Sequence, residues 1–243
     1  MSHDLFPLLR ECAHEIGEAV LAHRGRGYSG LRATQYHLDV VADEVALRVL
    51  GGAGLSVVSE ESGKSGSGPY TVVVDPIDGS TNCDRGIPFY ATSLAVLWQN
   101  ELVAGLVLNQ ATGAIYEAER GAGARRDGAP IAPSGRTTID SSIISFSGLA
   151  KQHLGWAQSR SLGAASLEIC LVADGSLDAF AVAQHSSLHP WDYLAGLLLI
   201  REAGAVAVDY HGDELVTSEM VPRHPLFAAT TELSDALIKF GPQ

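Results

Sequence analysis

The segment 72–82 constrains this chain most, because an apolar run there meets two carboxylates. Residues 72–74 are consecutive valines, which are typical of a buried β-strand. Asp75 and Asp78 follow, and Pro76 between them removes a backbone donor, so we expect the strand to end in a tight turn. Two carboxylates brought to one spot repel each other, and a divalent cation removes that repulsion. Hard oxygen ligands without histidine favour Mg²⁺ over zinc.

The residues that come next, Gly79-Ser80-Thr81-Asn82, predict the start of a short helix. The free N–H groups of a helix start bind phosphate oxygens, so one turn is predicted to combine metal ligands with a phosphate site. A lone Asp-Pro-x-Asp also occurs by accident as an acidic surface turn. Two further acidic clusters favour the metal site: Glu60-Glu61 after a predicted strand, and Asp192 at a predicted helix start, where helix capping is the alternative.

Composition excludes several function classes. The net charge is −12, and no stretch clusters Lys and Arg, so we expect neither a nucleic-acid partner nor an anionic membrane surface. The 3 cysteines form no CxxC pair. The N-terminus lacks a basic region followed by an apolar core, and the longest apolar stretch, 194–200, is too short for a membrane span. We therefore expect a cytoplasmic protein.

Periodicity predicts a mixture of helices and short strands. Residues 61–69 are rich in glycine and proline and are predicted to form a loop. Helices interleaved with antiparallel and isolated strands predict a layered α+β or mixed α/β fold. We expect a single domain over 1–243, with a soft division near 134–141 into an N-terminal α+β half and a C-terminal α/β half. Helices are predicted over 5–24, 40–50, 164–173, 191–203 and 232–240, and strands over 55–58, 70–74, 92–98, 102–108, 114–117, 142–146, 177–182, 205–208 and 226–229.

Three motifs carry a family resemblance. Asp75-Pro76-Ile77-Asp78-Gly79-Ser80-Thr81-Asn82, with Glu60-Glu61-Ser62 before it and Trp191-Asp192-Tyr193-Leu194-Ala195-Gly196 after it, resembles the inositol monophosphatase family. That family consists of Mg²⁺-dependent, lithium-sensitive phosphomonoesterases. The resemblance covers nearly the whole chain, and it implies a sugar-phosphatase-like sandwich of alternating α-β-α-β-α layers.

The resemblance also implies roles for individual residues. It implies that Glu60 and the Ser80 hydroxyl activate water, and that Asp43 hydrogen-bonds that hydroxyl. Glu61 is implied to be an outer carboxylate near the metals. Two or three Mg²⁺ ions are implied, with ligands from the side chains of Glu60, Asp75, Asp78 and Asp192 and the carbonyl of Ile77. Phosphate and substrate contacts are implied for Asp78, Gly79, Ser80, Thr81, Gly163 and Ala165.

The sequence departs from the family pattern in places that bear on the substrate. Val41 stands where the family prefers Thr, so we expect a looser network around Asp43. Ser80 replaces Thr but keeps the hydroxyl. The segment 181–189 has no acid, whereas the inositol enzymes carry a substrate-binding Glu there, and the stretch between residues 146 and 160 is short. Inositol phosphate is therefore one candidate substrate among several.

The resulting expectation is a Mg²⁺-dependent phosphatase that hydrolyses a small phosphate monoester. The candidates are an inositol monophosphate-like polyol phosphate, a sugar phosphate, or an amino-alcohol phosphate such as histidinol phosphate. A bisphosphate nucleotidase or fructose bisphosphatase is less favoured, because we see no extra basic cluster for a second phosphate. A catalytically weak relative that acts as a binding or regulatory protein is the alternative from another class. The family resemblance implies a homodimer.

Overall fold

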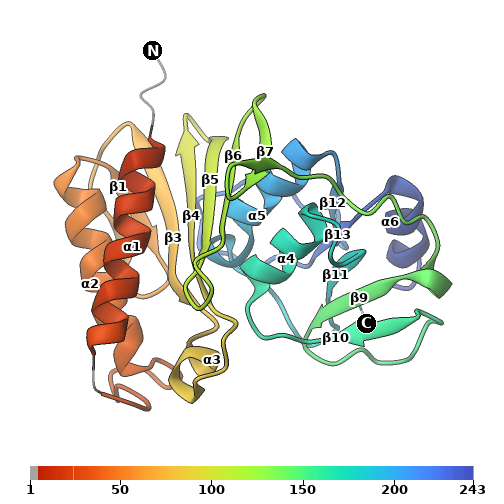
Figure 1. Ribbon diagram of the computed structural model, residues 1–243, viewed down its shortest axis with the longest axis horizontal. Coiled ribbons are helices and arrows are strands. Elements are labelled where there is room, and N and C mark those ends of the chain that lie inside the picture. Colours follow the sequence, from red (N-terminus) through yellow and green to blue (C-terminus); the bar gives the residue numbers. More distant parts are fainter. Residues whose placement is uncertain (1–4, 24, 243) are drawn as a thin grey trace.

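The computed structural model describes residues 5–23 and 25–242, and these form five layers (Figure 1). Helices α1 (Phe6–Ala22) and α2 (His37–Gly52) cover the outer face of an eight-stranded sheet. Helices α4 (Ala165–Ala173) and α5 (Pro190–Ala203) lie between that sheet and a five-stranded one, and α6 (Thr231–Ile238) covers the far face. The predicted α-β-α-β-α sandwich is confirmed.

The eight-stranded sheet supplies most of the N-terminal half, and its strands follow the order β2-β1-β3-β4-β5-β6-β7-β8. Strands β1 and β3 are parallel, and the other neighbours are antiparallel. Both faces of the central strands are buried: Val72 and Val74 of β3 pack toward α1 and α2, whereas Val73 packs toward α4 and α5. The strands are β1 (Ser56–Ser59), β2 (Gly63–Ser65), β3 (Tyr70–Asp78), β4 (Ala91–Trp98), β5 (Glu101–Asn109), β6 (Ile115–Glu119), β7 (Gly123–Arg126) and β8 (Ala129–Pro130).

The five-stranded sheet has the order β10-β9-β11-β13-β12. Strands β10, β9 and β11 are parallel, so their carboxyl ends meet at one edge. From that edge the chain passes into α4 after β10 and into α5 after β11. The remaining elements are β9 (Ile143–Ser147), β10 (Gln158–Arg160), β11 (Ala179–Val182), β12 (Val206–Asp209), β13 (Pro225–Ala228), the short helix α3 (Ser80–Arg85) and a 3₁₀ turn (Ile139–Ser141).

Several predicted boundaries were wrong. The predicted loop 61–69 contains β2, which pairs with β1. Strand β3 does not stop before Pro76 but continues to Asp78 through a register shift against β4, and the Thr92 hydroxyl donates to the Pro76 carbonyl at 2.8 Å. Helix α2 begins at His37, three positions before the predicted start. Strand β10 was not predicted, and the predicted helix end at Arg24 lies outside the described residues.

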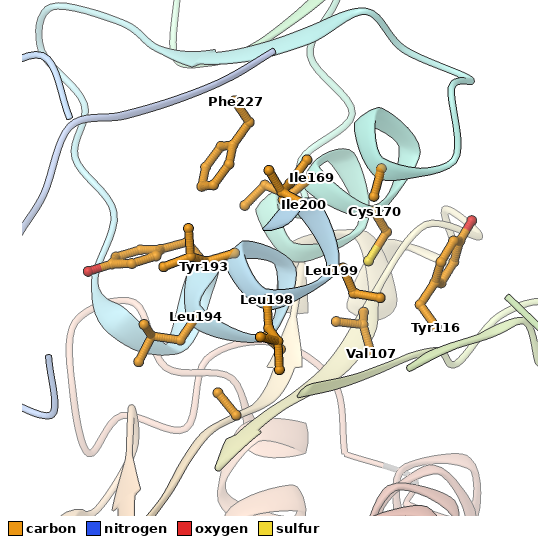
Figure 2. Packing of buried hydrophobic residues seen from close by; sticks show 14 of the residues in the cluster. Val107, Tyr116, Ile169, Cys170, Tyr193, Leu194, Leu198, Leu199, Ile200 and Phe227 are labelled. Atoms are coloured by element: carbon orange, nitrogen blue, oxygen red, sulfur yellow. The ribbon is translucent and has the colours of Figure 1, made fainter. Parts of the chain in front are cut away.

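Helix α5 is buried along most of its length, and Figure 2 shows its packing. Its Leu199 lies near Cys170 of α4 and Val107 of β5, and its Ile200 lies near Ile169 of α4. Gly105 allows a close approach, because a Cβ there would lie 2.9 Å from the carbonyl oxygen of Ala195. Close packing along most of the helix holds its first turn in a fixed position. None of the described helices has the length and apolar character needed to cross a bilayer.

Candidate metal centre and active site

Three carboxylates from separate segments meet at the edge of the eight-stranded sheet. Glu60 follows β1, Asp75 lies on β3, and Asp192 lies in the first turn of α5. Each offers an oxygen, and these atoms all lie within 4.8 Å of one another. Asp75 Oδ1 is buried and has no hydrogen-bond partner. A buried carboxylate oxygen without a donor needs a cation or a proton, so the residues present fit a hard divalent metal ion.

The electrostatics of this trio point the same way. Burial, followed by repulsion from Glu61, raises the pKa of Glu60 to about 7. Burial and the charges of neighbouring carboxylates raise the pKa of Asp75 and the pKa of Asp192 well above their usual range. These shifts describe a site in which buried negative charge is concentrated, which favours binding of a cation or a proton.

Asp192 serves the helix and the site at once. Its Oδ2 accepts a hydrogen bond from the backbone N–H of His189 at 2.6 Å, which closes a capping box at the start of α5. The Ser93 hydroxyl donates to the carbonyl of Trp191 at 3.1 Å and ties this turn to β4. Helix capping, the alternative role for Asp192, therefore occurs, and it fixes the carboxylate in the cluster.

Asp78 lies beside the trio, but its carboxylate is directed to the start of α4. It accepts from the backbone N–H groups of Ala165 at 3.2 Å and Ser166 at 2.7 Å, and from the Ser166 hydroxyl at 2.5 Å. Burial raises its pKa to about 6 against the opposing effect of these bonds. The metal cluster of the described residues contains Glu60, Asp75 and Asp192 without Asp78, so Asp78 as a metal ligand stays a prediction.

The Ser80 hydroxyl lies between a carbonyl and a carboxylate. It donates to the Ile77 carbonyl, the predicted metal ligand, at 3.0 Å. The carboxylate next to it is Asp39: burial raises the pKa of Asp39 to about 6, and a hydrogen bond with Ser80 is among the opposing causes. Asp39 occupies the third position of α2 and accepts from the Tyr36 backbone N–H at 2.7 Å.

Asp43, the predicted partner of Ser80, has a different place. One of its carboxylate oxygens accepts from the hydroxyls of Ser59 at 2.5 Å and Ser62 at 3.2 Å, on either side of Glu60 and Glu61. Because α2 starts earlier than predicted, Asp39 reaches Ser80 and Asp43 lies one turn further along. Two serine hydroxyls thus bind the Asp43 carboxylate, and the looser network expected around it from Val41 stays a prediction.

The predicted substrate residues converge at the start of α3. Gly79 has φ +86°, and a Cβ there would lie 3.0 Å from the carbonyl oxygen of Gly163. Asn82 donates to the carbonyls of Leu162 and Phe89, both at 2.8 Å, and so joins the 162–163 segment to α3. The Thr81 hydroxyl lies 3.0 Å from the Tyr36 hydroxyl. Gly79, Ser80, Gly163 and Ala165 are therefore brought together, while Thr81 also contacts the start of α2.

Sequence reasoning missed several residues of this site. A cavity of about 90 Å³ is lined by Arg32, Thr34, Gln35, Asp39, Glu60, Glu61 and Ser80. Glu61, the predicted outer carboxylate, accepts hydrogen bonds from Arg32 and Gln35. Asp39 carried a usable signal, because it stands where a capping carboxylate belongs. Arg32, Gln35 and Ser166 carried none, since their contacts join segments far apart in sequence.

Comparison with known proteins agrees with the geometry of the site. The pattern of the inositol monophosphatase family matches residues 38–239. The chain belongs to this family. A fructose-1,6-bisphosphatase/inositol-1-monophosphatase from Archaeoglobus fulgidus is 32% identical over 250 residues, covering 97% of this chain and 97% of that protein. Members of the inositol monophosphatase family are metal-dependent and act on small phosphorylated substrates.

Solved structures of the family share the fold. An inositol monophosphatase-fructose 1,6-bisphosphatase superposes with a TM-score of 0.85 at 29% identity, covering 98% of this chain and 99% of the other. The extragenic suppressor protein SuhB from Bartonella henselae gives a TM-score of 0.81 at 25% identity, covering 98% of each chain. The family thus includes both phosphatases and a protein named for genetic suppression.

Proposed function

We propose that this protein is a Mg²⁺-dependent phosphatase that hydrolyses a small phosphate monoester. The observation that carries the proposal is the buried, unpartnered Oδ1 of Asp75 within a cluster of three carboxylates. Glu60, Asp75 and Asp192 would hold the metal, together with the Ile77 carbonyl and Asp78. When bound there, two or three Mg²⁺ ions supply charge neutralisation for the phosphoryl group and lower the pKa of water.

The chain's own residues position the reactants. Backbone N–H groups of Gly79, Ser80 and Thr81 bind the phosphate, because Gly79 has no side chain to cap α3. Glu60 accepts the proton of the attacking water, the Ser80 hydroxyl orients that water, and Asp39 holds the hydroxyl. Asp43 supports the turn that carries Glu60. Phosphoryl transfer depends on this positioning more than on covalent help from the protein.

The alcohol part of the substrate lies against Gly163 and Ala165, which adjoin Gly79 and Asp78. We propose a small polyol, sugar or amino alcohol, such as inositol monophosphate or histidinol phosphate. The named activities of the relatives include fructose-1,6-bisphosphatase, so a bisphosphate belongs in the same test. The similarity to SuhB keeps a regulatory or binding role as the second candidate.

The setting proposed for this activity is a cytoplasmic homodimer without a nucleic-acid partner. The net charge of −12 supports the last point, because a phosphate backbone would be repelled. Size-exclusion chromatography with light scattering tests the dimer, and retention on nucleic acid at low salt tests the exclusion.

A substrate panel tests the function. Release of inorganic phosphate is measured from inositol monophosphate, histidinol phosphate, a hexose phosphate, fructose bisphosphate and adenosine bisphosphate, each with Mg²⁺ and with a chelator. We expect Mg²⁺-dependent release from at least one monoester. If none of the esters is hydrolysed at millimolar Mg²⁺, the phosphatase proposal fails and the regulatory role takes its place.

A further inference from the structure

Residues 27–36 form a strap over the turn that carries Glu60. Its ends are closed by backbone bonds: Ser29 N–H donates to the Gln35 carbonyl at 2.8 Å, and Tyr28 and Tyr36 form an isolated antiparallel bridge. The two tyrosine rings lie 4.7 Å apart between centroids. The tip of the strap, residues 30–34, is exposed. The strap therefore holds its tip at a defined place beside the site.

Arg32, at this tip, binds the Glu60–Glu61 turn through several atoms. Its guanidinium forms an ion pair with the Glu61 carboxylate at 2.5 Å, and it also donates to the Glu61 carbonyl and, at 3.4 Å, to the Glu60 carbonyl. Gln35 donates to the same Glu61 carboxylate, while its amide oxygen accepts from the Ser29 hydroxyl at 2.9 Å. Two donors of the strap thus bind the Glu61 carboxylate.

The opposite side of the turn is fixed as well. The Ser59 hydroxyl accepts from the Glu61 backbone N–H at 3.1 Å and donates to Asp43 of α2 at 2.5 Å. Between these two attachments the Glu60 side chain reaches Asp75 and Asp192. A metal ligand held from both sides pays less ordering entropy when the ion binds.

We propose that Arg32 is a positioning residue that sets the affinity of this site for its divalent cation, acting through Glu61 and the carbonyls of the turn. A guanidinium suits this task, because its planar fork of N–H donors reaches a carboxylate and two carbonyls together, which a lysine ammonium does not reproduce. The inference rests on the proposed function, since it needs the metal at Glu60. The proposed role differs from direct phosphate binding by Arg32, because the three contacts of Arg32 described above are all with the Glu60–Glu61 turn.

The test is a Mg²⁺ titration followed by thermal shift, which needs no substrate. The variants are Arg32→Ala, Arg32→Lys, Glu61→Gln and the double variant Arg32→Ala/Glu61→Gln. Arg48→Ala is the matched control, because the exposed Arg48 of α2 forms an ion pair of 2.6 Å with Glu15 of α1. We expect the Mg²⁺ concentration for half of the shift to rise by about tenfold in Arg32→Ala, the lower end of what loss of a supporting residue costs.

The remaining variants separate the explanations. Glu61→Gln also raises the Mg²⁺ midpoint, and the midpoint of the double variant is no higher than that of the more affected single variant. The midpoint of Arg32→Lys lies between those of wild type and Arg32→Ala, and the midpoint of Arg48→Ala equals that of wild type. A purely structural role lowers the metal-free melting temperature and leaves the midpoint unchanged, which overturns the inference. An unchanged midpoint with a raised KM for the ester at saturating Mg²⁺ also overturns it, because Arg32 would then contact substrate.

The inference and the proposed function fail separately. If wild type responds to Mg²⁺ but hydrolyses no ester, the phosphatase proposal falls, and the midpoints still decide the role of Arg32. If wild type shows no response to Mg²⁺, both fall together.

Discussion

Asp75→Asn distinguishes the repulsion among the clustered carboxylates in the metal-free protein from their predicted role as metal ligands. The substitution keeps the shape of the side chain and removes one negative charge from a buried group whose Oδ1 has no partner. In the absence of metal, an amide at this place relieves repulsion and can donate to Glu60 or Asp192. With Mg²⁺ present, the same amide removes a charged ligand. We therefore expect the variant to be more stable than wild type without metal and less stable with it.

The magnitude follows from the geometry. The ligand atoms lie within 4.8 Å of one another, and two unit charges at that distance repel by ~3.5 kcal/mol at an effective dielectric constant of about 20. Burial raises the pKa of Glu60 to about 7, and burial with neighbouring charges raises the pKa of Asp75 and the pKa of Asp192 well above their usual range, so the repulsion is correspondingly smaller. We expect metal-free Asp75→Asn to gain ~1 kcal/mol or more, which raises Tm by about 2–4 °C for a chain of this size.

The assay compares melting curves with a chelator and with Mg²⁺, together with phosphate release. A ligand at 100 times its dissociation constant stabilises wild type by ~2.7 kcal/mol, whereas Asp75→Asn should gain almost nothing. The order of the two melting temperatures should therefore reverse when Mg²⁺ is added, and phosphate release by the variant should fall to background. Asp235→Asn, an exposed change on α6, serves as the control and should follow wild type.

Two results would refute this reasoning. A variant that keeps the full Mg²⁺ shift and its turnover places the metal elsewhere. A variant that is less stable than wild type in chelator shows that Asp75 has a stabilising partner in solution. Repulsion among the carboxylates would then not destabilise the metal-free protein.

Three further predictions follow from the site. Ser80→Ala should lower kcat by about 100-fold with an unchanged Mg²⁺ midpoint, because the hydroxyl positions water, while Ser80→Thr keeps activity; steady-state kinetics decide this. Burial raises the pKa of Glu60 to about 7 and the pKa of Asp39 to about 6, so the folded metal-free protein binds more protons than the unfolded chain. The free energy of unfolding of the metal-free protein should therefore decrease as the pH is raised from about 4.5 to 7, and it should depend less on pH with Mg²⁺. A Tm that rises with pH in chelator would contradict this. The buried Glu168 carboxylate accepts hydrogen bonds from the Ser145 hydroxyl and the Leu162 N–H. Glu168→Ala should therefore lower the free energy of unfolding in urea by ~1–3 kcal/mol, and Glu168→Gln should lower it less. Equal losses in the two variants would contradict this prediction.

The layers and the three acidic segments could be predicted from the sequence because their signals are local. Runs of valine mark β3, a capping carboxylate marks the start of α5, and turn residues separate the strands that follow. The order of these elements predicts a layered mixed α/β fold, and the family resemblance supplied the alternating α-β-α-β-α layers. Which strands pair within each sheet, including β2 against β1, depends on long-range contacts that periodicity does not report.

The site itself was predicted less evenly. Asp39 and Asp43 both stand near a helix start, and a shift of one turn in that start decides which of them reaches Ser80. Tyr36 is an unusual residue before a helix, so nothing local marked His37 as the first helical position. The orientation of Asp78 toward Ser166 required the position of α4, which only the tertiary structure supplies.

Asp192 comes late in a chain whose other two clustered carboxylates, Glu60 and Asp75, are made early. The amino-terminal sheet leaves the ribosome before α5 is synthesised, so the growing chain contains two of the three clustered carboxylates without the third. On the proposed function, an ion held by all three carboxylates would stabilise only a fold in which α5 has docked, so it would give no help to nascent intermediates. Metal binding would accordingly follow the docking of α5 rather than guide it.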